Sequence, residues 1–244
     1  MANHQNKTRR AFLNAVYHSG LALALMRFSP ASMAVNFGLG QVPKKLADNK
    51  SIFELQGTVT VNGEKANMDT FIKADAKVVT ASNSYIIFKV GQDAHILREN
   101  STLQLEGSNV LESGLHLLSG KILSVFGQRD AQQKKHTLRT STATIGIRGT
   151  GVYAESDSDK SYLCTCYGHT LIQANAQPDQ TETIVSEHHD APRFILKDPE
   201  NKQLIIPAPV FNHTDEELIL IEALVGRESP ISVIQSYQTP RRGY

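Results

Sequence analysis

The stretch TSTATIGIRGTGVYAE, residues 140–155, decides the fold. Apolar residues occupy every second position from Ala143 to Ile147, which is the alternation of a half-buried β-strand. Its glycines could also suggest a phosphate-binding loop. However, GIRGTG lacks the G-x-G-x-x-G order, and the sequence predicts no helix after it whose N–H groups could hold a phosphate. The glycines therefore indicate close packing of strands.

Strand patterns continue on both sides of this stretch. Upstream, FELQGTVTVNG (53–63) alternates and ends in Asn-Gly, a strong hairpin signal. Downstream, SYLCTCYGHTLIQAN (161–175) reads as a further strand. Because turn residues separate the strands and no long helical period interrupts them, we expect a β domain at 51–186, preceded by a linker at 35–50.

A faint repeat places a glycine early in three of the strands, in LQGTVTV, LSGKILSV and CYGHTLIQ. Gly57, Gly120 and Gly168 hold these positions, and they predict bulges or close backbone approaches where one strand crosses another. We expect a mainly β fold, either a multi-stranded sandwich or a solenoid-like sheet stack.

The C-terminal segment, residues 187–244, begins irregularly and then predicts one amphipathic helix near 215–225. Thr214 and Glu217 match the capping box that starts a helix, and Gly226 follows as a stop signal. The apolar stripe of this helix predicts that it docks on the sheet.

The central strand resembles the hallmark of the FecR-like extracytoplasmic domain family, in which Thr and Ala precede Gly-x-Arg-Gly-Thr and an aromatic residue follows. The matching residues are Thr142, Ala143, Gly146, Arg148, Gly149 and Thr150. The chain departs from the pattern at GTGVY, where the aromatic residue comes later than usual. The resemblance covers about residues 51–175 and is specific only in the Arg-Gly-Thr strand, where it implies a structural role for these residues.

The best-known members of that family are inner-membrane regulators with a cytoplasmic anti-sigma segment and one membrane helix, and this sequence shows the pattern of neither. The resemblance implies the FecR-like fold and a non-enzymatic module that binds a ligand or protein partner in the bacterial cell envelope. It leaves a part in envelope signalling open, and it does not identify the partner.

Residues 1–34 have the order of an export signal: a basic segment, a short apolar stretch and small residues ending in SMA. Arg9 and Arg10 lie in TRRAFLN, which resembles the twin-arginine signal. We expect cleavage after Ala34 and a periplasmic location. The alternative is an amphipathic anchor helix that is retained.

Charge argues against nucleic acid as a partner. The chain has 25 basic and 24 acidic residues; four basic and no acidic residues lie in 1–34, which leaves 21 against 24 and a net charge of −3. A mildly acidic chain without a Lys/Arg cluster is a poor nucleic-acid binder. Since no apolar run approaches the roughly 18 residues of a membrane span, we also expect no integral membrane segment after removal of the signal.

The chain has two cysteines, Cys164 and Cys166, in one predicted strand. Residues two apart in a strand point to the same face, with Cα atoms about 6.6 Å apart. A disulfide at that spacing needs a sharply bent strand. The same display suits a metal ion, a pair of small core residues, or redox-active thiols, and the sequence leaves these alternatives open.

If the cysteines bind a metal, His188 and His189 in SEHHDAPR supply the nearest further ligands. Two thiolates with one or two imidazoles suit zinc or copper. His169 and His213 are reserve ligands. Because adjacent histidines on a strand face opposite ways, both could bind one ion only from an irregular loop.

The sequence gives no sign of an enzyme. It contains neither Gly-x-Ser-x-Gly nor His-Glu-x-x-His, and no nucleophile is signalled beside the histidine pair. We expect Asp190 to cap a turn and Arg193 to pair locally.

Replacing both Arg9 and Arg10 by Lys is expected to retain the precursor in the cytoplasm, because the twin-arginine pathway recognises the arginine pair. Cell fractionation followed by immunoblotting measures this. Unchanged export of the double variant would contradict the route, and an intact N-terminus on the exported protein would contradict cleavage.

Overall fold

The computed structural model describes residues 42–109, 112–127, 136–198, 200 and 202–231. The expected signal sequence, with Arg9, Arg10 and the cleavage point after Ala34, lies outside the described residues, as does the first part of the expected linker, residues 35–41.

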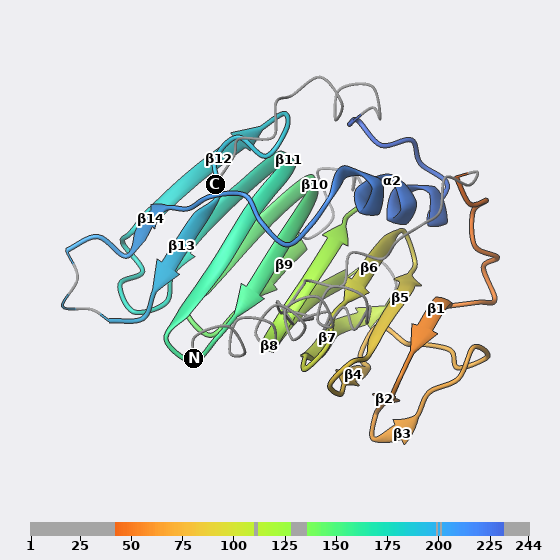
Figure 1. Ribbon diagram of the computed structural model, residues 1–244. Helices are drawn as coiled ribbons and strands as arrows, with labels where there is room; N and C mark the ends of the chain where they lie inside the picture. Colours follow the sequence, from red (N-terminus) through yellow and green to blue (C-terminus); the bar gives the residue numbers. More distant parts are fainter. Residues whose placement is uncertain (1–41, 110–111, 128–135, 199, 201, 232–244) are drawn as a thin grey trace, which may run out of the picture. The chain divides into compact units, whose positions relative to one another are not determined.

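The described residues form fourteen strands and one helix: β1 (Ile52–Gln56), β2 (Val59–Val61), β3 (Glu64–Lys65), β4 (Lys77–Thr80), β5 (Tyr85–Val90), β6 (Asp93–Leu97), β7 (Thr102–Asn109), β8 (Glu112–Val125), β9 (His136–Arg139), β10 (Ala143–Ser156), β11 (Lys160–Ala174), β12 (Thr181–Ser186), β13 (Arg193–Leu196), β14 (Ile205–Pro207) and α2 (Asp215–Leu224). All strands belong to one connected sheet (Figure 1). The mainly β class with a C-terminal helix, predicted from the sequence, is confirmed.

Three long strands divide this sheet into two layers. The first half of β8 pairs with β7 and β9, and its second half pairs with β6 and β10. Strand β10 pairs first with β9 and then with β8, while β11 pairs first with β13 and then with β12. The first layer therefore runs β3-β2-β4-β7-β8-β9-β10-β11-β12, and the second runs β1-β5-β6-β8-β10-β11-β13-β14.

The main hydrophobic core contains side chains from both layers. Its fully buried members include, from the first layer, Val78, Leu103 and Leu138, and from the second, Ile86, Val152 and Ile195. Burial of each such side chain stabilises the fold by roughly 1.5–3 kcal/mol. The alternation read from the sequence provides these inward-facing positions.

The long strands change layer at glycines. Gly120 in β8 and Gly168 in β11 have φ values of 91° and 90°. A Cβ on Gly120 would lie 2.2 Å from Ser101 Oγ, and one on Gly168 would lie 2.6 Å from Gly149 O, so no other residue fits there without a shift. The close approaches predicted from the repeat are confirmed at these positions.

The Arg-Gly-Thr residues mark the change of layer in β10. The pairing with β11 shifts register between Arg148 and Gly151, and Gly149 has a φ of 56°. Thr150 is buried, and its hydroxyl oxygen accepts from the backbone N–H of His169 at 3.0 Å. Gly146 lies in the first half of β10, opposite Leu171. Gly149 and Thr150 thus lie at the crossing of the strand, whereas Gly146 lies in the regular ladder before it.

The sheet continues beyond residue 186, into the segment expected to be irregular. Strand β13 pairs with the first half of β11, and β14 pairs with β13. The chain then crosses the outer face of the second layer and ends in α2, which lies against β6 and β8 (Figure 1). As predicted, Thr214 and Glu217 form a capping box at the start of α2.

A second apolar cluster lies between α2 and the outer face of the second layer. Its members from the helix are Leu218, Leu220, Ile221 and Leu224, and its members from the strands beneath include Ile87, Ile96, Leu123 and Val125.

None of the helices in the described part of the chain has the length and apolar character of a membrane span.

A buried histidine makes stability depend on pH. Burial is the main reason that the pKa of His95 falls from 6.5 to about 4. The negative charge of Asp93 raises this pKa, and the positive charge of His136 lowers it further. Its Nδ1 lies 2.9 Å from Ser124 Oγ. Because the pKa is lower in the folded state, the contribution of neutral His95 is present above the unfolded value and is lost as pH falls toward about 4.

We expect the wild type to lose about 2–3 kcal/mol more unfolding free energy between about pH 7 and pH 4.5 than the His95→Gln variant. Urea unfolding at the two pH values measures the difference. His169→Gln, at an exposed position, is the control and should keep the wild-type dependence. Parallel pH dependence in wild type and His95→Gln would contradict the assignment.

Candidate metal centre

Cys164 and Cys166 lie side by side on the outer face of the second layer, below the C-terminal segment. Both are free thiols, and both are 0% exposed. Cys164 is opposite Tyr153 of β10, but Cys166 is an extra residue in the pairing, because Thr165 faces Val152 and Tyr167 faces Gly151. This bulge also brings Tyr167, which strict alternation would place on the opposite face, into the same cluster as the cysteines.

The loop after β12 places His189 over the cysteines. As expected, Asp190 caps this turn: its Oδ2 accepts from the backbone N–H groups of Glu187 and His188 at 2.7 and 3.2 Å. The N–H of His189 donates to Cys166 O at 2.9 Å, and His189 has a φ of 53°. Such a left-handed conformation is uncommon outside glycine, and it turns the imidazole toward Cys164, with Nδ1 3.3 Å from Sγ.

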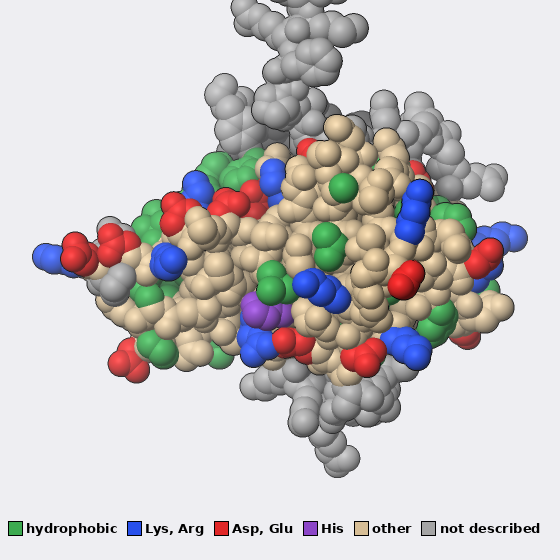
Figure 2. All heavy atoms as spheres, turned by 90° about the horizontal axis from the view of Figure 1, so that it is seen from below, with side chains coloured by type: hydrophobic (Ala, Val, Ile, Leu, Met, Phe, Trp, Pro, Cys, Tyr) green, Lys and Arg blue, Asp and Glu red, His purple; other side chains and the backbone are tan. Residues whose placement is uncertain are grey.

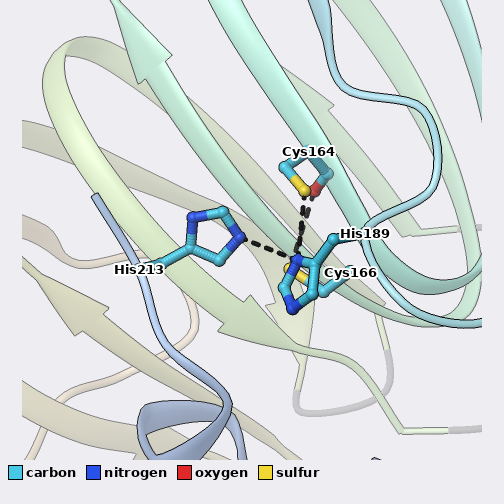
Figure 3. Close-up of side chains that lie close together, drawn as sticks. All are labelled: Cys164, Cys166, His189 and His213. Atoms are coloured by element: carbon cyan, nitrogen blue, oxygen red, sulfur yellow. Dashed lines mark hydrogen bonds between the residues drawn. The ribbon is translucent and has the colours of Figure 1, made fainter. Parts of the chain in front are cut away.

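His213 enters from the segment that precedes α2. Its Nδ1–H donates to Phe211 O at 2.7 Å, and its ring stacks on Tyr153 with centroids 4.6 Å apart. These contacts direct Nε2 toward His189, whose Nδ1 lies 3.0 Å away. Figure 3 shows the four side chains meeting: the cysteines from β11, His189 from the loop and His213 from the C-terminal segment.

Asp215, the first residue of α2, holds His189 from outside. Its Oδ1 accepts from His189 Nε2–H at 2.9 Å. The neighbouring His188 turns away from the cysteines, and its Nε2 lies 3.0 Å from Asp215 Oδ2. Of the two histidines expected beside the cysteines, the structure brings only His189 to them; His213, a reserve ligand in the sequence analysis, lies there in place of His188.

The geometry fits a tetrahedral metal site. The ligand atoms of Cys164, Cys166, His189 and His213 all lie within 4.8 Å of one another. Zinc–sulfur and zinc–nitrogen bond lengths would place such atoms about 3.3–3.8 Å apart. Each imidazole donates its outer N–H to a carboxylate or a backbone carbonyl, which is the usual support of a metal-binding histidine. The inner nitrogens are left to bind a proton or a cation.

The pKa shifts describe the same arrangement. Burial opposes ionisation of Cys164, but hydrogen bonds with Cys166, His189 and His213 outweigh it and lower its pKa well below the ordinary value. Burial and the adjacent Cys164 raise the pKa of Cys166. Burial also disfavours charged His189, yet hydrogen bonds with Asp215 and Cys164 raise its pKa to about 9. The centre thus holds a thiolate beside a proton that a cation can displace.

A nucleophilic role suits this site less well. A chain of hydrogen bonds runs from Cys164 to His189 and on to Asp215. It has the arrangement of a nucleophile, a base and a group that orients the base. However, Cys164 is 0% exposed, so a substrate would not reach its sulfur. An enclosed set of four donors is typical of a structural metal site.

Other residues singled out in the sequence lie elsewhere. His169 is exposed on the first layer, between Arg148 of β10 and Val185 of β12, and does not approach the cysteines. Asp215 escaped notice because an acidic residue at the start of a helix is ordinary. His213 could have been identified as a ligand only with the knowledge that the C-terminal segment crosses β11.

Comparisons with known proteins find a distant likeness in structure and none in sequence. No family model matches the sequence, and no curated protein matches it. Among solved structures, two crystal structures of a "putative anti-sigma factor" from Parabacteroides distasonis ATCC 8503 are similar, each with a TM-score of 0.43 and 8% identity. The matched region covers 54% of this chain and 58% of that chain, little more than half of each. The likeness is distant.

Proposed function

We propose that this chain is an exported, non-enzymatic zinc-binding module of the bacterial cell envelope. Cys164, Cys166, His189 and His213 are the ligands. One observation carries the proposal: both imidazoles are tied by their outer nitrogens, so that their inner nitrogens meet two buried sulfurs within 4.8 Å.

Zinc suits this donor set better than other ions. Two sulfurs and two nitrogens around one point favour tetrahedral coordination, which is typical of zinc. Copper, the other ion suggested by the sequence, prefers tetragonal geometry as Cu(II) and would need the reduced state to accept this arrangement. Since all four positions belong to the protein, the role that fits is structural: the ion links the β12–β13 loop and the C-terminal segment to β11.

The location and partner class rest on the sequence. The twin-arginine pattern supports export to the periplasm, and the Arg-Gly-Thr strand supports a FecR-like module that binds an envelope protein or ligand. On the face in Figure 2, basic and acidic side chains are interspersed and neither gathers into a patch. We expect that the processed chain binds no nucleic acid and has no membrane segment.

Untagged protein is expected to bind about one equivalent of zinc, which elemental analysis and competition with a chromogenic chelator measure. Cys164→Ser and His213→Ala should each weaken zinc binding by more than about 100-fold, because they remove a ligand, and Asp215→Asn by about 10- to 100-fold, because it removes the support of one.

His188→Ala is the matched control, since this imidazole is adjacent in sequence but lies outside the four-donor set; it should change the affinity by less than about tenfold. Binding of less than about 0.2 equivalents of any transition metal would contradict the proposal. Copper in place of zinc in protein purified without added metal would overturn the choice of ion and keep the site, whereas a higher affinity for copper in competition would not, because copper binds most nitrogen and sulfur sites more tightly than zinc.

A further inference from the structure

Helix α2 is attached to the sheet at both polar and apolar positions. Arg98, directly after β6, forms a buried ion pair with Glu217 at 2.9 Å. Tyr167 of β11 donates a hydrogen bond to Glu222. On the same helix, Leu218, Ile221 and Leu224 are buried against the outer face of the second layer.

The beginning of α2 belongs to the candidate metal centre. His213 is a ligand, Thr214 is the N-cap, and Asp215, the first helical residue, accepts from His189. Three consecutive residues therefore join the metal ligands to the start of the helix. Because α2 has only ten residues, it is too short to be stable by itself in water and depends on being held against the sheet.

We infer that metal occupancy regulates the docking of α2: the bound ion holds the helix on the sheet, and loss of the ion releases it and uncovers the apolar face beneath. This inference rests on the proposed zinc binding. Without the ion, His213 loses its link to the sulfurs of β11, and the start of the helix is held there only by the hydrogen bonds of His213 and Asp215 with the loop histidines.

The apolar face that would become accessible is defined by buried side chains of β5, β6 and β8: Ile87, Ala94, Ile96, Leu123 and Val125. The main core between the two layers lies on the other side of these strands. Release of α2 is therefore expected to be local and to leave the pairing of the strands in place.

Linkage makes the effect reciprocal. If zinc stabilises the docked helix, then a docked helix must strengthen zinc binding by the same factor. Leu224 is the last residue of the helix and is 0% exposed. It lies about 14 Å from Asp215 along the helix axis, because nine residues rise by about 1.5 Å each. Its truncation tests the coupling without touching a ligand.

Hydrogen exchange of the full chain, with zinc and after removal of zinc by a chelator, is the direct test. Amides of Leu218–Leu224 should exchange at least about tenfold faster without zinc, while those of Thr102–Glu106 in β7 change by less than about twofold. Unchanged exchange in α2, in protein that binds zinc stoichiometrically, would overturn the inference and leave the proposed function intact. Equal acceleration in β7 and α2 would also overturn it, since the ion would then stabilise the whole fold.

Leu224→Ala is expected to weaken zinc binding about tenfold. Leu103→Ala in the main core is the matched control, because it removes the same side chain from an equally buried position, and it should change zinc affinity by less than about twofold. Equal losses in the two variants would contradict the coupling. A wild-type chain that binds no zinc would overturn both the inference and the proposed function.

Discussion

Four donor atoms point toward one buried position beside β11, and the attachment of the C-terminal segment follows from how they are held. Each imidazole is held from outside, His189 by Asp215 and His213 by the carbonyl of Phe211. Their inner nitrogens and the two sulfurs therefore lie close together away from water. The negative charge of a thiolate in this position needs a nearby positive charge. A proton on His189 partly balances the Cys164 thiolate, and a divalent cation would balance both thiolates while using every lone pair.

The same bulge connects the centre to the strand that carries the family resemblance. In β10 the register shifts between Arg148 and Gly151 and again before Val152, opposite Cys166. Cys166 is therefore without a partner in β10 at the point where β10 crosses between layers. The crossing that the glycines mark and one proposed ligand therefore lie within a few residues of each other.

Local patterns in the sequence predict much of this structure. Alternation identifies the strands, Gly120 and Gly168 mark their crossings, and the Thr214–Glu217 capping box sets the start of α2. These features succeed because they depend on neighbours in the chain. The pairing of β13 and β14 with β11, and the choice of His213 in place of His188, depend on contacts between distant segments, which local periodicity does not encode. The left-handed backbone of His189 separates two adjacent histidines in a way that strand geometry would not suggest.

X-ray absorption spectroscopy of the zinc-loaded full chain tests the central claim most directly, because it reads the donor atoms around the ion. We expect about two sulfurs near 2.3 Å and two nitrogens near 2.0–2.1 Å, and the loss of one sulfur in Cys166→Ser. A shell of nitrogen and oxygen atoms without sulfur would contradict it, since the ion would then bind away from β11.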